Sequence, residues 1–532
     1  MRYSSTQREK NPFCSGRRNR VRVSREPPLL HRRSAPVSVR TSPPTTPVSP
    51  PAGLRDAWLP LAGLSAVFLF EMLDNSVLNV ALPTIARDLR ASTTALQWVS
   101  GAYSVAFGGL MLLFGAVADR VGRRRTMLVG LVLLAVASLL TVFVTSVQEL
   151  IVVRALMGVA AAMTTPGSMA LAFRLFARQD LRVRALTVIS TAGLVGLAVG
   201  PTVGGFVLAV APWQVLLVAD VPIAVVAFAG IRAGIAADRP DDLHRDPIDV
   251  AGAVLGTASI VGVLVTPTLV VGGAAGWAGW GAGAVTALVA VGFVVRERTA
   301  HHPLLDLHLI ARPLVASGLA YKAAAGLAMA ALSYLVTLQL QFAWGWPPAL
   351  AAVGTLPQVV VLLASGRLVG PFVQRVGLDR AARISAAAVV AGLAVFALTA
   401  RLGYPGVLVA LVLVAAGMRV VGAVAGNNVL HGLPADRTSI GAALVDTASE
   451  IATAVGIAAT GTILAALVPG DLGTTPWAPG RTAAFEGAVS IAGAVVTAVA
   501  AVLVVVGMLR ARTAATPSTA TAPTTSQENT DV

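Results

Sequence analysis

The 532-residue sequence has few charged residues, one cysteine and only two lysines. Charged residues make up 12% of the chain, against roughly 25% in an average soluble domain, and 56% are hydrophobic, so a soluble fold is disfavoured. The lone Cys14 excludes an intrachain disulfide and a cysteine-based metal site. Histidine forms no metal-ligand cluster with Asp or Glu, and His301 and His302 fall in an expected surface loop. We therefore expect no cofactor, no metal and no enzymatic activity.

Long apolar runs dominate the chain. Stretches of about 20 residues recur from near Trp58 to near Leu509, and each can cross a hydrocarbon core of about 30 Å as a helix. We count fourteen spans, which predicts an all-α polytopic membrane protein. Arginines gather in alternate loops, such as residues 123–125, whereas the loops near Pro212 and Trp346 carry no Lys or Arg. By the positive-inside rule both termini then face the cytoplasm.

The net charge of +15 does not indicate a nucleic-acid partner, because the basic residues lie in alternate loops and in the N-terminal segment. Residues 1–56 are rich in Arg, Ser and Pro and are expected to form a disordered cytoplasmic tail. A transit peptide and a wrongly assigned start remain alternatives for this segment, whereas no apolar region supports a signal peptide. Residues 510–532 are interpreted as a second tail.

Charged residues inside the expected spans need a reason, since a charge at the bilayer centre costs roughly 2.5–3.5 kcal/mol. Glu71 and Asp74 are three residues apart in the first span, and Asp446 and Glu450 are four apart in the thirteenth, so each pair shares a helix face. Arg154 lies in the fourth span. A carboxyl shielded from water can load and release a proton near neutral pH, and an arginine nearby opposes the loading. Such groups can couple transport to protons, but an Arg–acid pair can also be purely structural.

Three further charges have no assigned role. Lys322 in the ninth span could extend its ammonium group to the interface. Asp220 in the sixth span is either a third acidic site or a residue at the membrane edge. Arg419 in the twelfth span has no partner in the sequence pattern. Trp213 and other tryptophans near span ends are interpreted as interfacial anchors.

The fifth span contains Gly196, Gly200 and Gly204 at intervals of four, with Pro201 and Gly205 beside them. Small residues at this spacing let helix backbones approach closely. Close packing alone explains the glycines. A mobile contact that seals one side of a cavity explains the glycines and the proline together.

Two loops repeat one motif. The first consists of residues 115–125, and its marked positions are Gly115, Asp119, Arg120, Gly122 and Arg123. The second has Gly370, Arg375 and Gly377 at matching positions, with Gln374 in place of the aspartate. Internal repeats of helix bundles are typical of secondary transporters.

These motifs, in this order, resemble the major facilitator superfamily and, within it, the fourteen-helix drug:proton antiporters. The resemblance covers residues 57–509 and includes the first-span signature at 73–83, Arg154 followed by Gly158, and the glycine motif of the fifth span. The acidic pair within 445–451 resembles the subset that exports quaternary ammonium and other organic cations. Lys322 and Arg419 argue against a purely cationic substrate range.

The resemblance implies two six-helix bundles, residues 57–233 and 313–509, with two inserted central helices within 234–312. Asp74, with Glu71 beside it, would bind a proton or cation, and Arg154 would couple protons. Asp446 and Glu450 would be further protonation or cation sites. Asp119 and the arginines after it would govern gating, and the first loop would gate more strongly than the second, which has Gln374 at the matching position.

The function expected is proton-coupled export of lipophilic drugs or antibiotics, organic cations above all, by alternating access. The alternative is a dedicated exporter of an endogenous natural product that is neutral or anionic. A membrane receptor without transport and an intramembrane enzyme are disfavoured. The expected partners are the substrate, protons and the lipid bilayer, without nucleic acid, for a monomer in a bacterial plasma membrane.

Overall fold

The computed structural model describes residues 53–176, 178–238, 249–271, 276–301, 303, 306–434, 438–468, 472, 477 and 479–515. Every element in this part of the chain is a helix. Nearly all of the two expected tails, together with His302 and the loop arginines Arg239, Arg245 and Arg437, lies outside the described residues. The last helix continues to Ala515, past the expected start of the C-terminal tail.

The first half of the chain forms seven α-helices and two short 3₁₀ helices, Arg55–Ala57 and Thr141–Phe143. The α-helices are α1 (Trp58–Asp88), α2 (Thr93–Val121), α3 (Arg123–Leu140), α4 (Val147–Leu175), α5 (Gln179–Val207), α6 (Gln214–Val218) and α7 (Asp220–Gly234). Apolar composition drives these segments into the membrane, and local caps set where they begin. The hydroxyl of Ser146 accepts from the backbone N–H of Glu149, and the Glu149 carboxylate accepts from the N–H of Ser146, which forms a capping box for α4.

Two central helices follow the first half in the chain, and the helices of the second half come after them. The pair is α8 (Val250–Val271) and α9 (Gly276–Thr299). The second half contains α10 (Leu307–Ala311), α11 (Pro313–Leu338), the π-helix η4 (Gln339–Ala343), α12 (Pro348–Ala364), α13 (Gly366–Val376), α14 (Leu378–Thr399), α15 (Tyr404–Gly432), α16 (Thr438–Leu467) and α17 (Pro479–Ala515).

The described part of the chain contains 12 helices that are long and apolar enough to cross a membrane, or up to 14 if each bent pair is one span. The bent pairs are the two parts of α2, at 51°, and α12 with α13, at 57°. The expected all-α polytopic class is therefore confirmed.

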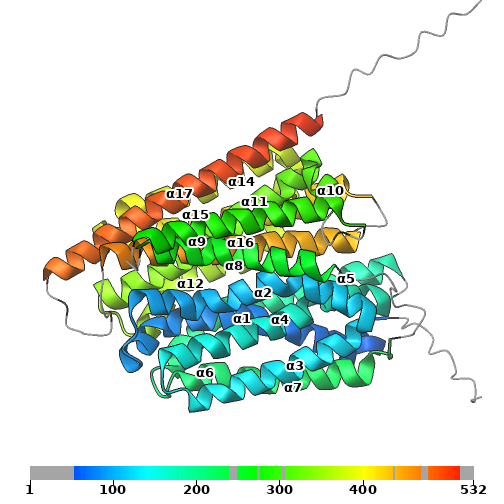
Figure 1. The fold of residues 1–532 in the computed structure, drawn as a ribbon, viewed down its shortest axis with the longest axis horizontal. Coiled ribbons are helices and arrows are strands. Elements are labelled where there is room, and N and C mark those ends of the chain that lie inside the picture. The colour runs from blue at the N-terminus through cyan, green and yellow to red at the C-terminus, as the bar shows by residue number, and fades with distance from the viewer. Residues whose placement is uncertain are drawn as a thin grey trace, which may run out of the picture. The chain divides into compact units, whose positions relative to one another are not determined.

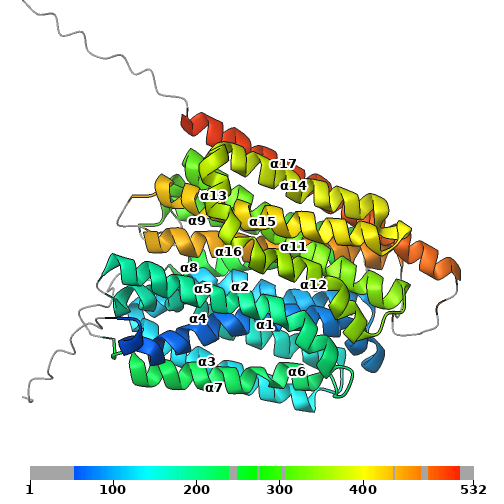
Figure 2. The ribbon, with the colours of Figure 1, turned by 180° about the vertical axis from the view of Figure 1, so that it is seen from behind.

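Helices of each half pack mainly with one another (Figures 1 and 2). In the first half α1 packs on α5 and α7, and α4 packs on α2 and α3. In the second half α11 packs on α15, α16 and α17. The halves meet along two seams, α2 with α16 and α5 with α12, and α8 packs on both α2 and α16 beside the first seam. The residue limits of the expected domains stay a prediction.

The helices have two ends, which we call the α1–α2 end, where α1 passes into α2, and the α2–α3 end, where α2 passes into α3. Trp213 lies near the α1–α2 end, but it is not the interfacial anchor expected from its position. It is 2% exposed, and its indole nitrogen donates to the Asp88 carboxylate at 2.7 Å. The indole N–H of Trp213 is already hydrogen-bonded to a carboxylate inside the protein. It therefore does not need the polar groups of the membrane interface as acceptors. Trp277 and Trp280 are exposed, as an anchor requires.

Candidate functional site

A buried ion pair joins the first and fourth helices. Nη1 of Arg154, on α4, donates to both carboxylate oxygens of Asp74, on α1, at 2.7 and 2.8 Å. Both side chains are 0% exposed. In such surroundings an ion pair is only stable if each charge keeps its partner, because an unpaired buried charge is costly. The two residues that the sequence singled out separately are thus direct partners.

A second carboxylate and an aromatic ring complete this group. Asp220, at the start of α7, is 1% exposed and interacts electrostatically with Asp74 and Arg154. The Tyr103 ring, on α2, lies 4.7 Å from the Arg154 guanidinium carbon, which is cation–π distance. Oδ2 of Asp220 and Nε of Arg154 have no hydrogen-bond partner. We call Asp74, Tyr103, Arg154 and Asp220 the buried ion cluster; formally it holds two negative charges and one positive charge.

Glu71 belongs to a different group, although it shares α1 with Asp74. Its carboxylate accepts from the Thr165 hydroxyl, on α4, at 2.9 Å, and its side chain is 5% exposed. It interacts electrostatically with Glu450, Asp446 and Lys322, which belong to the second half. Glu71 therefore links the acidic pair of the first span electrostatically to that of the thirteenth span, across the halves.

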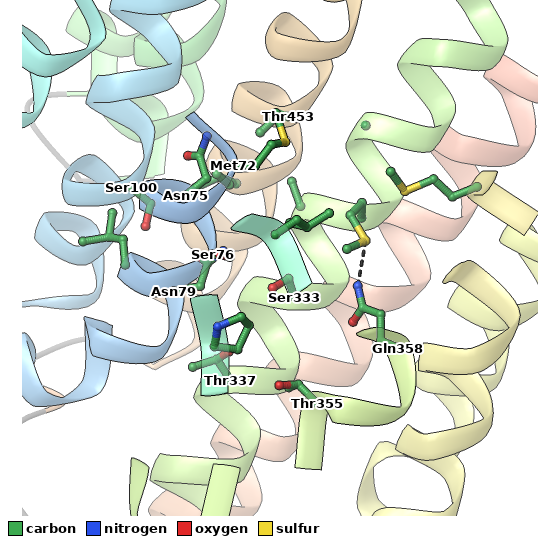
Figure 3. A pocket seen from close by; sticks show the side chains of 18 of the residues that line it. Met72, Asn75, Ser76, Asn79, Ser100, Ser333, Thr337, Thr355, Gln358 and Thr453 are labelled. Atoms are coloured by element: carbon green, nitrogen blue, oxygen red, sulfur yellow. Dashed lines mark hydrogen bonds between the residues drawn. The ribbon is translucent and has the colours of Figure 1, made fainter. Parts of the chain in front are cut away.

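A cavity of about 190 Å³ lies between the two halves (Figure 3). The first half contributes α1, α2 and α5, and the second half contributes α11, α12, α15 and α16. Its neutral polar lining includes Asn75, Asn79, Ser333, Thr337 and Thr355. Gln358 lies on the α12 wall and donates to the Met329 sulfur at 2.7 Å. The wall is therefore a mixture of apolar and hydrogen-bonding groups.

Two charged side chains line this cavity, Lys322 on α11 and Glu450 on α16. Of the expected site residues, Pro201 and Glu450 are in the wall, whereas Asp74 is fully enclosed in the buried ion cluster. Lys322, whose role the sequence left open, is thus part of the cavity wall. Arg419 is not in the wall, because its Nη2 lies beside Gly366 where α13 begins.

The glycines of α5 pack against two different helices. A Cβ at Gly196 or Gly200 would collide with α1, at Leu69 and Ser76 respectively. Gly204 has ordinary contact distances to α1, whereas a Cβ at Gly205 would lie 2.6 Å from Ala352 on α12. Close packing thus explains the motif within the first half, and Gly205 extends it to the seam between the halves.

Hydrogen bonds also join the halves toward the α1–α2 end. They run from Thr93 Oγ1 to Val468 O at 3.4 Å, from Gln97 Nε2 to Thr462 Oγ1 at 3.3 Å, and from Gln341 Nε2 to Val80 O at 3.0 Å. With the contact at Gly205, these bonds hold both seams together at that end.

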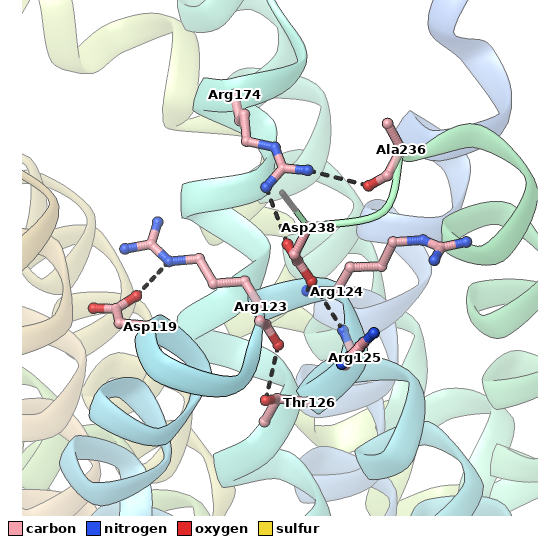
Figure 4. Close-up of polar contacts among 9 residues, drawn as sticks. Asp119, Arg123, Arg124, Arg125, Thr126, Arg174, Ala236 and Asp238 are labelled. Atoms are coloured by element: carbon pink, nitrogen blue, oxygen red, sulfur yellow. Dashed lines mark hydrogen bonds and ion pairs between the residues drawn. The ribbon is translucent and has the colours of Figure 1, made fainter. Parts of the chain in front are cut away.

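The first loop motif is tied together at the α2–α3 end (Figure 4). Asp119 pairs with Arg123 at 2.6 Å, and Gly122 has a φ of 118°, which glycine adopts without strain. A second carboxylate, that of Asp238 after α7, accepts from the backbone N–H of Arg124 at 3.1 Å. It also accepts from the N–H of Arg125 at 3.4 Å and from the Arg174 guanidinium at 3.0 Å.

Asp238 therefore caps the N-terminus of α3 from a distant part of the chain, where a negative charge is favoured by the helix dipole. Arg120 is exposed beside this group, and Gly115 faces Pro166 on α4. In the second loop motif Gln374 is exposed, and a Cβ at Gly370 would meet nothing within 4 Å. The comparative strength of the two gates stays a prediction.

The sequence reasoning missed Asp238, Tyr103 and Thr165. Asp238 is a lone acid in a loop, and Tyr103 and Thr165 look like ordinary residues of apolar helices. Asp220 was noted, and its burial with Asp74 and Arg154 rules out a place at the membrane edge. Within the described ranges, no three His, Cys, Asp or Glu side chains are placed to hold a metal ion.

Known proteins resemble the chain in sequence and in fold. The sequence profile of the Major Facilitator Superfamily matches residues 64–249. The multidrug efflux pump LfrA of Mycolicibacterium smegmatis is 29% identical over 443 residues, which cover 82% of this chain and 87% of LfrA. The cephamycin export protein CmcT of Amycolatopsis lactamdurans is 34% identical over 314 residues, 57% of this chain and 63% of CmcT. The chain thus spans less than two thirds of CmcT.

A solved structure supports the same fold. A bacterial homologue of the human lysosomal transporter Spinster, inward-facing and unoccupied, superposes with a TM-score of 0.62 at 14% identity. The match covers 86% of this chain and 97% of that chain. At this identity the likeness concerns the fold alone.

Proposed function

Because the chain belongs to the major facilitator superfamily, we propose that it exports lipophilic drugs or antibiotics in exchange for protons. The observation that carries this proposal is the cavity between the halves, with Glu450 in its wall and the buried ion cluster beside it. The relatives named as a multidrug efflux pump and a cephamycin export protein support export as the direction.

Transport proceeds by alternating access, with the cavity opening to one side of the membrane at a time. At about 190 Å³ the cavity is smaller than the roughly 300–1,000 Å³ of drug-sized sites, so binding a substrate requires the halves to move apart. The seams at the α1–α2 end are the contacts that must break for opening on that side. Gly205 allows α5 and α12 to meet there without a side chain between them.

Proton coupling is assigned to the acids of α1 and α16, with Asp220. The buried ion cluster carries one more carboxylate than guanidinium, so a single proton would balance its charge. Glu71, Asp446 and Glu450 form the second acidic group, which adjoins the cavity. Each proton entering down a membrane potential supplies about 2.3 kcal/mol per 100 mV. An organic cation and a proton would then compete for Glu450.

We place the protein in a bacterial plasma membrane as a monomer, with both termini in the cytoplasm. Most of the arginines of the described loops lie at the α2–α3 end, which by the positive-inside rule faces the cytoplasm. The joined seams at the α1–α2 end then close the outer side. This orientation leaves the cavity to open inward, where an exporter collects its substrate.

The test uses inside-out membrane vesicles with an acid interior and measures the uptake of ethidium. Wild-type uptake should collapse when an uncoupler removes the proton gradient. Asp74→Asn and Asp220→Asn should abolish uphill uptake while keeping downhill exchange, because the cavity is intact but the acid is lost. Glu450→Gln should raise the KM for ethidium. Asp180→Asn, an exposed carboxylate paired with Arg178, is the matched control and should behave as wild type.

Two outcomes would contradict the proposal in different ways. Ethidium uptake that continues unchanged in the presence of the uncoupler would show that transport is not coupled to protons. If vesicles that contain correctly folded wild-type protein take up no lipophilic cation, then lipophilic cations are not its substrates.

The second candidate is a dedicated exporter of a natural product that is neutral or anionic. The observation in its favour is Lys322 in the cavity wall, since a lysine repels a simple cation. The naming of a relative as a cephamycin exporter supports the same candidate. Transport of anionic antibiotics, but not of ethidium, would select it.

A further inference from the structure

Lys322 and Glu450 lie in the same cavity and on neighbouring helices, yet they do not pair. Gly326, one turn after Lys322, packs against Ser449, the residue before Glu450. Lys322 interacts electrostatically with Glu450, but no carboxylate oxygen in the described part of the chain lies within 4 Å of its ammonium group. The two charges are thus close enough to act on one bound molecule and too far apart to satisfy each other.

Glu450 has an unfilled hydrogen-bonding position. Its side chain is 8% exposed, its Oε2 has no partner, and the residue is in the cavity wall. Buried polar atoms are rarely left unpaired in a folded protein. A group with a donor, such as an ammonium, fits this position.

The charges are confined to one end of the cavity. The helices α11 and α16 both begin at the α2–α3 end, and Lys322 on α11 and Glu450 on α16 come before most of the other residues that their helices contribute to the wall. Farther along, the lining is neutral: Met329 follows Lys322 on α11, and Thr337 and Thr355 lie toward the α1–α2 end (Figure 3). The cavity therefore offers a charged region and a largely uncharged region to an elongated molecule.

A monocation and a monoanion each satisfy only one of the two charges. An ammonium group would fill the free position of Glu450, but Lys322 would repel it. A carboxylate would bind Lys322, but Glu450, with Asp446 and Glu71 nearby, would repel it. A molecule with both groups satisfies both side chains, because charge-assisted hydrogen bonds form at each.

We propose that the preferred substrates are amphipathic zwitterions, whose carboxylate binds Lys322 while the basic group binds Glu450. The apolar body then occupies the uncharged region of the cavity. This inference rests on the proposed export function and narrows its substrate class.

The test compares a fluorescent rhodamine that has a free carboxylate and amino groups with its methyl ester, in which one added methyl group removes the negative charge. Uptake into inside-out vesicles is measured for the wild type, Lys322→Gln, Lys322→Arg and Arg419→Gln. Arg419→Gln removes a positive charge from the same half but outside the cavity wall. Ethidium uptake is measured in parallel as the test of export itself.

The wild type should prefer the free acid. Lys322→Gln should raise the KM for the acid by about 10- to 100-fold, the range for a hydrogen bond to a charged group, and leave the ester unchanged or improved. Lys322→Arg should retain most of the preference, and Arg419→Gln should retain all of it. An equal loss for acid and ester in Lys322→Gln would mean that the lysine only balances the neighbouring acids, and would overturn the proposal.

A wild type that exports ethidium and the ester but not the acid would also overturn it, while leaving the export function standing. A wild type that exports none of the three compounds would instead contradict the proposed function.

Discussion

Replacing Arg154 by methionine should destabilise the protein strongly, while the double variant with Asp74→Leu should recover the part of the loss that comes from the unpaired Asp74. The pair is the most enclosed charge contact among the described residues, with both side chains 0% exposed. Arg154→Met leaves Asp74 without its cation and Asp220 without its electrostatic partner. Asp74→Leu then removes one of these two carboxylates, whereas Asp220 stays without its cation in both variants.

The magnitude follows from burial. Breaking a buried ion pair by removing one partner costs about 3–5 kcal/mol, because the other charge stays in surroundings of low polarity. Loss of the contact with the Tyr103 ring adds about 0.5–2 kcal/mol. Replacing both charged residues by apolar ones of similar size is often close to neutral. The coupling free energy between the two substitutions should therefore be about 3 kcal/mol or more.

The assay is reversible unfolding in mixed detergent micelles by added SDS, followed by circular dichroism of the helices. The wild type, two single variants and the double variant form a double-mutant cycle. Arg123→Met, at the partly exposed pair with Asp119, is the control and should cost less than about 1 kcal/mol. A coupling energy below about 1 kcal/mol for the buried pair would refute the reasoning.

Three further predictions concern other contacts. Asp238→Ala should cost about 0.5–2 kcal/mol and speed amide hydrogen exchange at Arg124, since the cap of α3 is lost, whereas Asp238→Asn should cost less. Gly205→Val should force α5 from α12 and raise the labelling, from the α1–α2 end, of a cysteine introduced into the cavity wall; unchanged labelling would contradict the seam. Arg296 donates to both Asp249 oxygens and lowers the pKa of that carboxyl, so its stabilisation is complete above the ordinary value near 3.8 and is lost as pH falls through the lowered pKa. The thermal stabilities of wild type and Asp249→Asn should therefore differ by a constant amount from pH 5 to 7 and converge only below about pH 4.

The fold could be predicted from the sequence because the bilayer imposes it. A helix must be about 20 apolar residues long to cross the hydrocarbon core, and that length is visible without a structure. The bends were not predictable. The break in α2 between Met111 and Leu113 has no proline, and the break at Ser365 precedes a glycine that is one of many in the chain.

Several charged residues of the buried ion cluster and the cavity could be singled out from the sequence, but their partners could not. Glu71 and Asp74 share a helix face in a coarse sense, yet three residues at 3.6 per turn leave them about 60° apart around α1. That angle is enough to direct Asp74 to Arg154 inside the first half and Glu71 toward the acids of the second half. Asp238 could not be found at all, because its partners are backbone amides over a hundred positions away in the chain.

The helix α1 takes part in the buried ion cluster, in the second acidic group and in the cavity wall, on which the proposed function depends. It carries Asp74 of the buried ion cluster, Glu71 beside the second acidic group, and Asn75 and Asn79 of the cavity wall. Its Ser76 hydroxyl also approaches Gly196 O on α5 at 3.4 Å. A substitution on α1 can therefore impair transport through the ion pair, the cavity or the packing on α5. Loss of uptake in Asp74→Asn therefore indicates a loss of proton coupling only if the same variant keeps its unfolding free energy and its downhill exchange. The unfolding free energy reports the packing, and downhill exchange reports the cavity, each separately from the acid.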